Sequence, residues 1–161
     1  MKNSVLFLFI LSLTFLVFSI PKARTMGRLL ASVATQSKRH GDPFSRSGAL
    51  IIGGETTVDV RGKGIGGRNQ EVALSAINGI TGLDGTMVAC LATDGIDGTS
   101  NAAGAIIDGR SAQRAKRIRI RPDEFMAKND SYRFFRRLND NILTGRTGTN
   151  VGDIYLLVSS N

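Results

Sequence analysis

Apolar residues are spaced differently along the chain, and each spacing predicts a type of element. Within residues 22–40 they recur every three or four positions, which indicates a helix with one buried stripe. This stripe is expected to contain Met26, Leu29, Leu30, Val33 and Ala34. Gly41-Asp42-Pro43 is expected to end the helix, because a residue that precedes proline avoids the helical conformation.

The rest of the chain alternates between strand-like and helix-like patterns. Continuous apolar runs predict buried strands at 49–52, 87–92, 105–107 and 154–158. The alternating residues 56–60 predict a half-buried strand, separated from the run at 49–52 by a bend at Gly53-Gly54. Further helices are expected over 68–80, in the basic stretch after residue 110 and over 130–138. The alternation indicates an α/β fold, a single domain of mixed strands and helices.

The length supports one domain, because 161 residues are close to the usual domain size of about 100–150. We divide the chain into a hydrophobic N-terminal segment (1–21), a helical lead-in (22–48) and a main domain (49–158). The chain has one cysteine, Cys90, so an intramolecular disulfide is excluded and a reducing compartment is favoured. Cys90 lies in a predicted strand and is expected to be a core residue.

The N-terminal segment contains sixteen consecutive residues without charge, 5–20. A secretion signal has an apolar stretch of about 7–15 residues and a membrane-spanning helix needs about 20, so length decides nothing. More basic residues follow this stretch than precede it, which favours retention on the cytoplasmic side. Three explanations stay open: a membrane anchor, with membrane contact through 5–20, a secretion signal, and an artefact of the assigned start.

The net charge of +8 raises the question of an anionic partner. Residues 110–137 contain ten Lys or Arg and three acidic residues, a net charge of +7 that accounts for most of the excess. This region has no recognised nucleic-acid-binding motif, so a solvated helix surface is favoured and no nucleic acid is expected. His40 is the only histidine, which excludes a Ser-His-Asp triad and a histidine metal site.

Thirteen of the nineteen glycines fall between residues 53 and 109, and one cluster has the chemistry of a phosphate loop. The segment Gly62-Lys63-Gly64-Ile65-Gly66-Gly67 precedes the helix expected at 68–80. Glycines let a backbone approach phosphate closely, and a helix N-terminus attracts anions. Lys63 and Arg68 add cations. The G-x-G-x-x-G spacing also permits a dinucleotide site, which needs an acidic residue about 20 residues on, at the end of the next strand. Here Asp84 precedes that strand and Asp94 comes 27 residues after Gly67. A glycine turn that only packs helix on strand is the structural alternative.

Two further loops carry polar residues next to predicted strands. Thr93-Asp94-Gly95-Ile96-Asp97-Gly98 follows the strand at 87–92, and its two carboxylates suit a hydroxylated substrate or a hard cation. The alternative is a turn in which aspartates bond to nearby backbone N–H groups. The loop 144–150 is rich in glycine and hydroxyl groups and precedes the last strand, but its pattern is non-specific.

Five blocks in this order resemble the MOFRL domain, the C-terminal part of the glycerate 2-kinase family, some of whose members carry the older label hydroxypyruvate reductase. The blocks are Gly53-Gly54-Glu55-Thr56-Thr57-Val58, Arg61-Gly62-Lys63-Gly64 with Gly66-Gly67-Arg68-Asn69-Gln70-Glu71, Thr93-Asp94-Gly95-Ile96-Asp97-Gly98, Asn129-Asp130-Ser131-Tyr132-Arg133-Phe134-Phe135, and Thr144-Gly145 with Thr147-Gly148-Thr149-Asn150-Val151. The resemblance covers residues 22–161, with the MOFRL part at about 49–158.

The resemblance implies the C-terminal half of a two-domain kinase that phosphorylates the 2-hydroxyl of D-glycerate in the cytoplasm, using ATP and Mg²⁺. Arg68 would stabilise charge on the transferring phosphoryl group, with Glu55 and Asp94 as further catalytic residues. Cofactor-binding residues would be Lys63, Gly64, Gly66, Gly67, Thr147 and Asn150. Metal ligands would be Asp94 and Asp97. The family's N-terminal domain is expected as a missing partner.

The sequence departs from the family pattern at several positions. Thr99-Ser100-Asn101 stands where the family commonly has Pro-Thr-Asp, and Gly152 stands where it usually has Asn. The apolar segment 5–20 replaces the strand and loop that lead into the first helix. Two alternatives follow: a non-catalytic remnant or membrane-tethered binding module, and, from the glycine pattern alone, an NAD(P)-linked hydroxypyruvate reductase.

Overall fold

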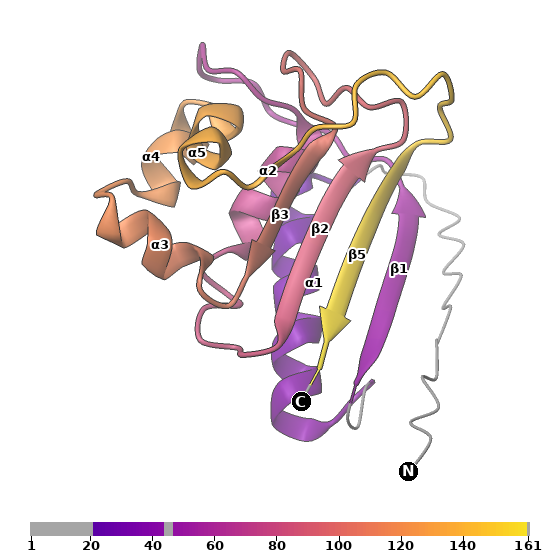
Figure 1. Ribbon diagram of the computed structural model, residues 1–161, viewed down its shortest axis with the longest axis vertical. Coiled ribbons are helices and arrows are strands. Elements are labelled where there is room, and N and C mark those ends of the chain that lie inside the picture. The colour runs from indigo at the N-terminus through magenta and orange to yellow at the C-terminus, as the bar shows by residue number, and fades with distance from the viewer. Residues whose placement is uncertain (1–20, 44–46, 161) are drawn as a thin grey trace.

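A five-stranded sheet with helices packed behind it forms the domain in a computed structural model, which describes residues 21–43 and 47–160 (Figure 1). The strands are β1 (Gly48–Gly54), β2 (Thr86–Ala92), β3 (Gly104–Asp108), β4 (Asn141–Ile142) and β5 (Asp153–Ser159). The helices are α1 (Ala23–His40), α2 (Arg68–Ala76), α3 (Ser111–Arg117), α4 (Pro122–Ala127) and α5 (Ser131–Leu138). The structure confirms the mixed α/β single domain.

The strands are arranged in the order β1-β5-β2-β3-β4, and every neighbouring pair is antiparallel. In this register Ile51 of β1 pairs with Leu156 of β5, which in turn pairs with Ala89 of β2. The carboxyl ends of β1 and β2 therefore lie at the same edge as the amino end of β5. Figure 1 shows the loops that leave these ends gathered at the top of the sheet.

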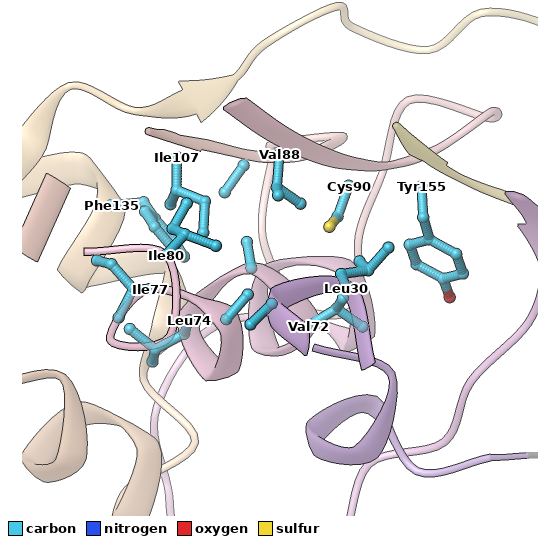
Figure 2. Close-up of a cluster of buried hydrophobic side chains, with 14 of the residues drawn as sticks. Leu30, Val72, Leu74, Ile77, Ile80, Val88, Cys90, Ile107, Phe135 and Tyr155 are labelled. Carbon is cyan, nitrogen blue, oxygen red and sulfur yellow. The ribbon is translucent and has the colours of Figure 1, made fainter. Parts of the chain in front are cut away.

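Side chains of the sheet and of α1 and α2 form the core, as Figure 2 shows. Val88, Cys90 and Tyr155 point from the sheet towards Leu30 of α1 and Val72 of α2. All five are fully buried. The expectation that Cys90 is a core residue is thus confirmed, and burial raises the pKa of its thiol well above the ordinary value.

Close contact between α1 and α2 depends on small residues. A Cβ atom on Gly27 would lie 2.3 Å from the carbonyl oxygen of Val72, so a larger residue there would separate the helices. The buried face of α1 contains Ala23, Gly27, Leu30, Ala31, Ala34 and Ser37. The predicted stripe was wrong at Leu29, which is 46% exposed. The face of α1 that packs against the core is centred on the small residues Gly27, Ala31 and Ala34 instead.

Three other expectations about elements were wrong. Residues 56–60 do not form a strand of the sheet: they make one bridge, at Thr57, with Lys22. The alternation of residue types over 56–60 reflects the burial of Thr56 rather than hydrogen bonding to a neighbouring strand. Gly53-Gly54 is no bend but the end of β1, and α2 ends at Ala76, followed by turns, rather than at residue 80.

Helices α3, α4 and α5 lie on the β3 side of the sheet in Figure 1. The short α4 begins with Pro122 at its first turn and was not expected separately, and neither was β4. Phe134 and Phe135 of α5 are fully buried and contact each other edge to face, with ring centroids 5.2 Å apart. Through these two rings the basic region 110–137 packs against the hydrophobic core.

The expectations about an anchor or a secretion signal concern residues 5–20, which lie outside the described residues. Among the residues that the structure describes, none of the helices has the length and apolar character needed to cross a membrane.

Candidate active site

Four parts of the sequence, 55–71, 92–99, 129–131 and Asn150, line an open cleft of about 670 Å³ beside the carboxyl ends of β1 and β2. The cleft brings together most of the predicted site residues, including those of the glycine loop and of the Asp94 loop. Those that line it are Glu55, Gly64, Gly66, Gly67, Arg68, Asp94, Asp97 and Asn150. Lys63 and Thr147 are exposed and lie outside this lining.

Arg68 is the first residue of α2 and is held from two sides. Its Nε and Nη2 donate to the two carboxylate oxygens of Asp153 at 2.7 and 3.0 Å, a bidentate arrangement. Its Nη1 donates to Glu55 at the rim of the cleft. Burial by itself would lower the pKa of Arg68, but Asp153 and Glu55 raise it above the usual value. The guanidinium therefore stays charged and has one fixed direction.

Asp153 begins β5, and its side chain is fully buried. Besides Arg68, its oxygens accept hydrogen bonds from Asn69 Nδ2 at 3.0 Å and from the hydroxyl of Tyr155 at 3.2 Å. Burial, together with the nearby Asp153 charge, raises the pKa of Tyr155 far above its usual value, so its hydroxyl remains a donor. Asp153 is thus the anchor that fixes Arg68.

Asp97 lies beneath the cleft with 1% exposure and closes the N-terminus of α2. Its two oxygens accept from the backbone N–H groups of Asn69 and Gln70, at 3.0 and 2.9 Å, and from the side-chain amides of both residues. These groups would otherwise lack partners at the start of the helix. Burial raises the pKa of Asp97, although the four hydrogen bonds oppose this effect. Asp97 already accepts four hydrogen bonds, and metal binding by this carboxylate stays a prediction.

The glycine loop packs tightly against the link between α4 and α5. A Cβ atom on Gly62 would lie 2.2 Å from the carbonyl oxygen of Lys128, and one on Gly64 would lie 2.5 Å from Asp130 Cβ. Packing therefore explains these two glycines, whereas nucleotide contact by Gly64, Gly66 and Gly67 stays a prediction. No parallel strand-helix-strand unit occurs among the described residues, so the dinucleotide interpretation lacks its structural context.

The Asp94 loop and the loop at 144–150 are joined by hydrogen bonds. The hydroxyl of Thr147 donates to the carbonyl oxygen of Thr93 at 2.5 Å, and its backbone N–H donates to the carbonyl oxygen of Asp94 at 3.2 Å. Among the described residues, the Asp94 side chain accepts a hydrogen bond from the N–H of Ile96 alone, and Asp94 lines the cleft. Asn150 accepts from the N–H of Gly152. Thr147 therefore supports the Asp94 loop, and Asp94 retains free acceptor positions.

Residues 48–153 match the MOFRL family. The chain belongs to the MOFRL family. It is 43% identical over 135 residues to the D-glycerate 2-kinase of Thermotoga maritima, and the matched region covers 84% of this chain and 32% of the relative. It is 37% identical over 138 residues to the glycerate 2-kinase of Pyrococcus horikoshii, which covers 85% and 31%. A relative from Agrobacterium vitis, 38% identical, carries a hydroxypyruvate reductase name.

Solved structures agree with this family. The crystal structure of the glycerate kinase of Thermotoga maritima superposes with a TM-score of 0.88 at 38% identity, covering 96% of this chain and 36% of that one. The MOFRL chain thus spans about a third of the length of these relatives.

Several site residues of the MOFRL domain were not singled out in the sequence. Asn129 accepts from the N–H groups of Arg61 and Gly62 at 2.8 and 2.9 Å, and its amide donates to Glu71 at 3.0 Å. Glu71 is buried and also pairs with Arg24 of α1 at 2.8 Å. Asp153, which holds Arg68, was not predicted as a site residue either. Partners of this kind are separated by 47 to 85 residues, which local patterns do not reveal.

The carboxylates of the MOFRL domain do not form a metal cage of their own. Among the described ranges, 21–43 and 47–160, no group of three or more His, Cys, Asp or Glu could hold a metal ion. In the cleft Glu55 pairs with Arg68, and Asp97 accepts four hydrogen bonds. Asp94 is therefore the carboxylate of the cleft that is available to bind a metal ion. Mg²⁺ usually takes only one or two carboxylates together with substrate phosphates, so this donor set suits a metal ion that arrives with a phosphate chain.

Proposed function

We propose that this chain is the MOFRL domain of a D-glycerate 2-kinase and that its cleft promotes phosphoryl transfer from ATP to the 2-hydroxyl of D-glycerate. The observation that carries the proposal is Arg68, a charged guanidinium at the cleft whose direction is fixed by the buried Asp153. The names of the relatives from Thermotoga maritima and Pyrococcus horikoshii supply the substrate and the reaction class.

Phosphoryl transfer needs positioning and positive charge more than covalent chemistry, because negative charge is spread over the oxygens of the transferring group. Arg68 supplies a cation that needs no reorganisation, since Asp153 already holds its Nε and Nη2. Its Nη1 side, now bonded to Glu55, faces the rim where substrate would enter. We assign Glu55 to orienting the substrate, because its side chain is 58% exposed and free to exchange partners.

Asp94 is the residue of this chain that would hold Mg²⁺, and the ion when bound would neutralise charge on the phosphates. Asp97 is assigned to holding α2, and hence Arg68, in place rather than to the metal. The glycines of the 62–67 loop and Asn150 line the same cleft and leave room for a phosphate chain. Lys63 and Thr147, outside the lining, would act from the periphery.

A further domain is part of the proposal. The three most exposed large apolar side chains of the described residues are Val60, Leu143 and Val151, at 75%, 65% and 78%. All three lie on loops at the edge of the sheet that holds the cleft. Exposed apolar groups gathered at one edge favour contact with another protein surface. We assign that surface to the part of the relatives that this chain does not span.

The proposal is tested by mixing the full chain with a separately produced N-terminal part of the Thermotoga maritima relative and measuring formation of 2-phosphoglycerate from D-glycerate and ATP. We expect activity above that of either part alone, loss of this gain in Arg68→Ala, and no loss in Arg136→Ala, an exposed arginine of α5 away from the cleft. No gain from mixing would contradict the proposal. Calorimetry with D-glycerate and with ATP would then show whether the chain is a binding module without turnover.

A further inference from the structure

A second cavity, outside the cleft, lies between α4 and α5 on the basic region. Its volume is about 410 Å³, and it is lined by four cationic side chains, Arg119, Lys128, Arg133 and Arg137. Two acidic residues, Glu124 and Asp130, also reach it. The lining therefore has a net charge of +2 from these six side chains.

The acidic residues do not neutralise most of the cations. Asp130 pairs with Arg133 at 3.3 Å, and Glu124 lies 3.7 Å from Arg121, which is outside the cavity. Within the described part of the chain, Arg119, Lys128 and Arg137 have no ion-pair partner. Three unpaired cations around one hollow make a favourable place for an anion, since their mutual repulsion is relieved when it binds.

The floor of this basic cavity is apolar and orders one of the cations. Ile120 is 6% exposed, and Phe125 packs edge to face on the fully buried Phe134, with centroids 5.5 Å apart. The guanidinium of Arg137 lies over the Phe125 ring at 5.5 Å from its centroid. The Arg137 side chain is exposed, but this ring contact restricts its directions before any ligand arrives.

A single segment separates the basic cavity from the cleft. Along it Lys128 and Asp130 line the basic cavity, whereas Asn129 and Ser131 line the cleft. The same segment holds the glycine loop: the N–H of Gly64 donates to the Lys128 carbonyl oxygen and the N–H of Ile65 donates to Asp130, both at 2.9 Å. A ligand that pulls on the side chains of Lys128 or Asp130 therefore acts on the wall of the cleft.

We propose that the basic cavity binds a small phosphate-bearing anion and that its occupation shifts the glycine loop of the cleft. A small molecule fits better than a nucleic acid strand, because the cations line one hollow of about 410 Å³ whose lining also includes the apolar Ile120 and Phe125. The basic cavity and the cleft are coupled through residues 128–131, because these residues line both of them. A ligand that changes the position of this segment on one side also changes the wall on the other side. This inference does not depend on the kinase proposal.

The test uses pyrophosphate as the probe and the full chain carrying Arg68→Ala, so that binding in the cleft is weakened. Calorimetry is expected to show saturable binding that becomes about tenfold weaker in Lys128→Ala and in Arg137→Ala, the loss of one charge-assisted contact in each case. Arg136→Ala is the matched control: it removes the same charge from the neighbouring position of α5, outside the cavity, and should leave the affinity unchanged.

Amide chemical shifts measured by NMR test the coupling. Pyrophosphate is expected to shift the amide signals of Gly64 and Ile65 in the Arg68→Ala chain, and Lys128→Ala should abolish these shifts at the same concentration. Equal weakening by Lys128→Ala and Arg136→Ala would show diffuse attraction to a basic surface and overturn the proposal. So would complete loss of binding in Arg68→Ala alone, which would place pyrophosphate in the cleft and leave the kinase proposal intact.

Discussion

Two buried carboxylates perform different tasks beneath the cleft. Asp153 fixes the guanidinium of Arg68, whereas Asp97 satisfies the start of the helix that carries Arg68. Both are about 1% exposed, and each oxygen of both is a hydrogen-bond acceptor. Asp94, in the same loop as Asp97, is half-buried and has one hydrogen-bond donor. The two aspartates of that loop are therefore expected to respond differently to substitution.

Asp97→Ala should destabilise the domain by about 3 kcal/mol or more, because the backbone N–H groups of Asn69 and Gln70 would be buried without an acceptor. The two side-chain amides would also lose one of their acceptors and keep only Asp153 or Ser100. Asp94→Ala is the control and should cost about 1 kcal/mol or less, the value of one hydrogen bond. Urea denaturation followed by circular dichroism measures both. Similar losses for the two variants would show that Asp97 is not the structural cap that we describe.

The buried Tyr155 predicts a fall in stability at alkaline pH. Burial and the Asp153 charge raise the pKa of Tyr155, whereas an unfolded tyrosine releases its proton near pH ~10. Above that pH the folded chain binds more protons than the unfolded chain, so the free energy of unfolding decreases as pH rises. In Tyr132→Phe, where Tyr155 is the remaining tyrosine, tyrosinate absorbance should appear only together with loss of the circular dichroism signal. Ionisation with the fold intact would contradict this account.

Residue types reveal some of these roles and conceal others. Arg68 is recognisable because it follows a glycine loop and opens a helix, so that a cation and free N–H groups coincide. Asp153 has no such local signal: an acid before an apolar strand resembles a surface residue until the strand pairing buries it. Asp97 looks like a metal ligand or a turn residue, because its partners at Asn69 and Gln70 lie 27 to 28 residues away.

At the level of elements, small residues determine how closely α1 and α2 pack. Gly27 of α1 lies directly against the backbone of α2, and Ala31 lies against Gly79 just after it. The apolar periodicity predicted α1 and most of its buried face, but it included the exposed Leu29 and missed Gly27, since periodicity considers only apolar side chains. The strand expected at 56–60 failed for a related reason: Thr56 is buried by its bond with the Tyr155 hydroxyl at 3.2 Å, which imitates the alternation of a strand.

Gly27→Ala should destabilise the domain although alanine favours helix by about 1 kcal/mol over glycine. The added Cβ atom would meet the Val72 carbonyl oxygen at 2.3 Å and the Ser75 Cβ at 2.7 Å, and a backbone atom cannot move aside easily. We expect a net loss of about 2 kcal/mol in the free energy of unfolding, measured by urea denaturation. Gly53→Ala, with nothing within 4 Å of its added Cβ atom, is the control and should change little. A neutral or stabilised Gly27→Ala would contradict the packing described for α1 and α2.

On the scale of the whole molecule, the antiparallel order of the sheet creates the cleft. Four of the five strands were predicted at nearly the right positions, but the order β1-β5-β2-β3-β4 depends on pairing between the first and the last strand of the described chain. Local patterns contain no information about such pairing, so the sequence supported an α/β class without the antiparallel topology. The same order places the Glu55, Asp94 and Asn150 loops at one edge, beside the exposed Val60 and Val151.

The central claim is that this domain supplies the phosphate-directed cation of a glycerate 2-kinase. A fusion in which the described domain of this chain replaces the matching third of the Thermotoga maritima relative tests it most directly, with the rate of D-glycerate phosphorylation as the measurement. We predict an active fusion whose kcat falls about 100-fold or more in Arg68→Ala, the scale expected for removing one group that stabilises developing charge, and which is unaffected by Arg136→Ala. An active fusion that keeps its kcat in Arg68→Ala would contradict the account.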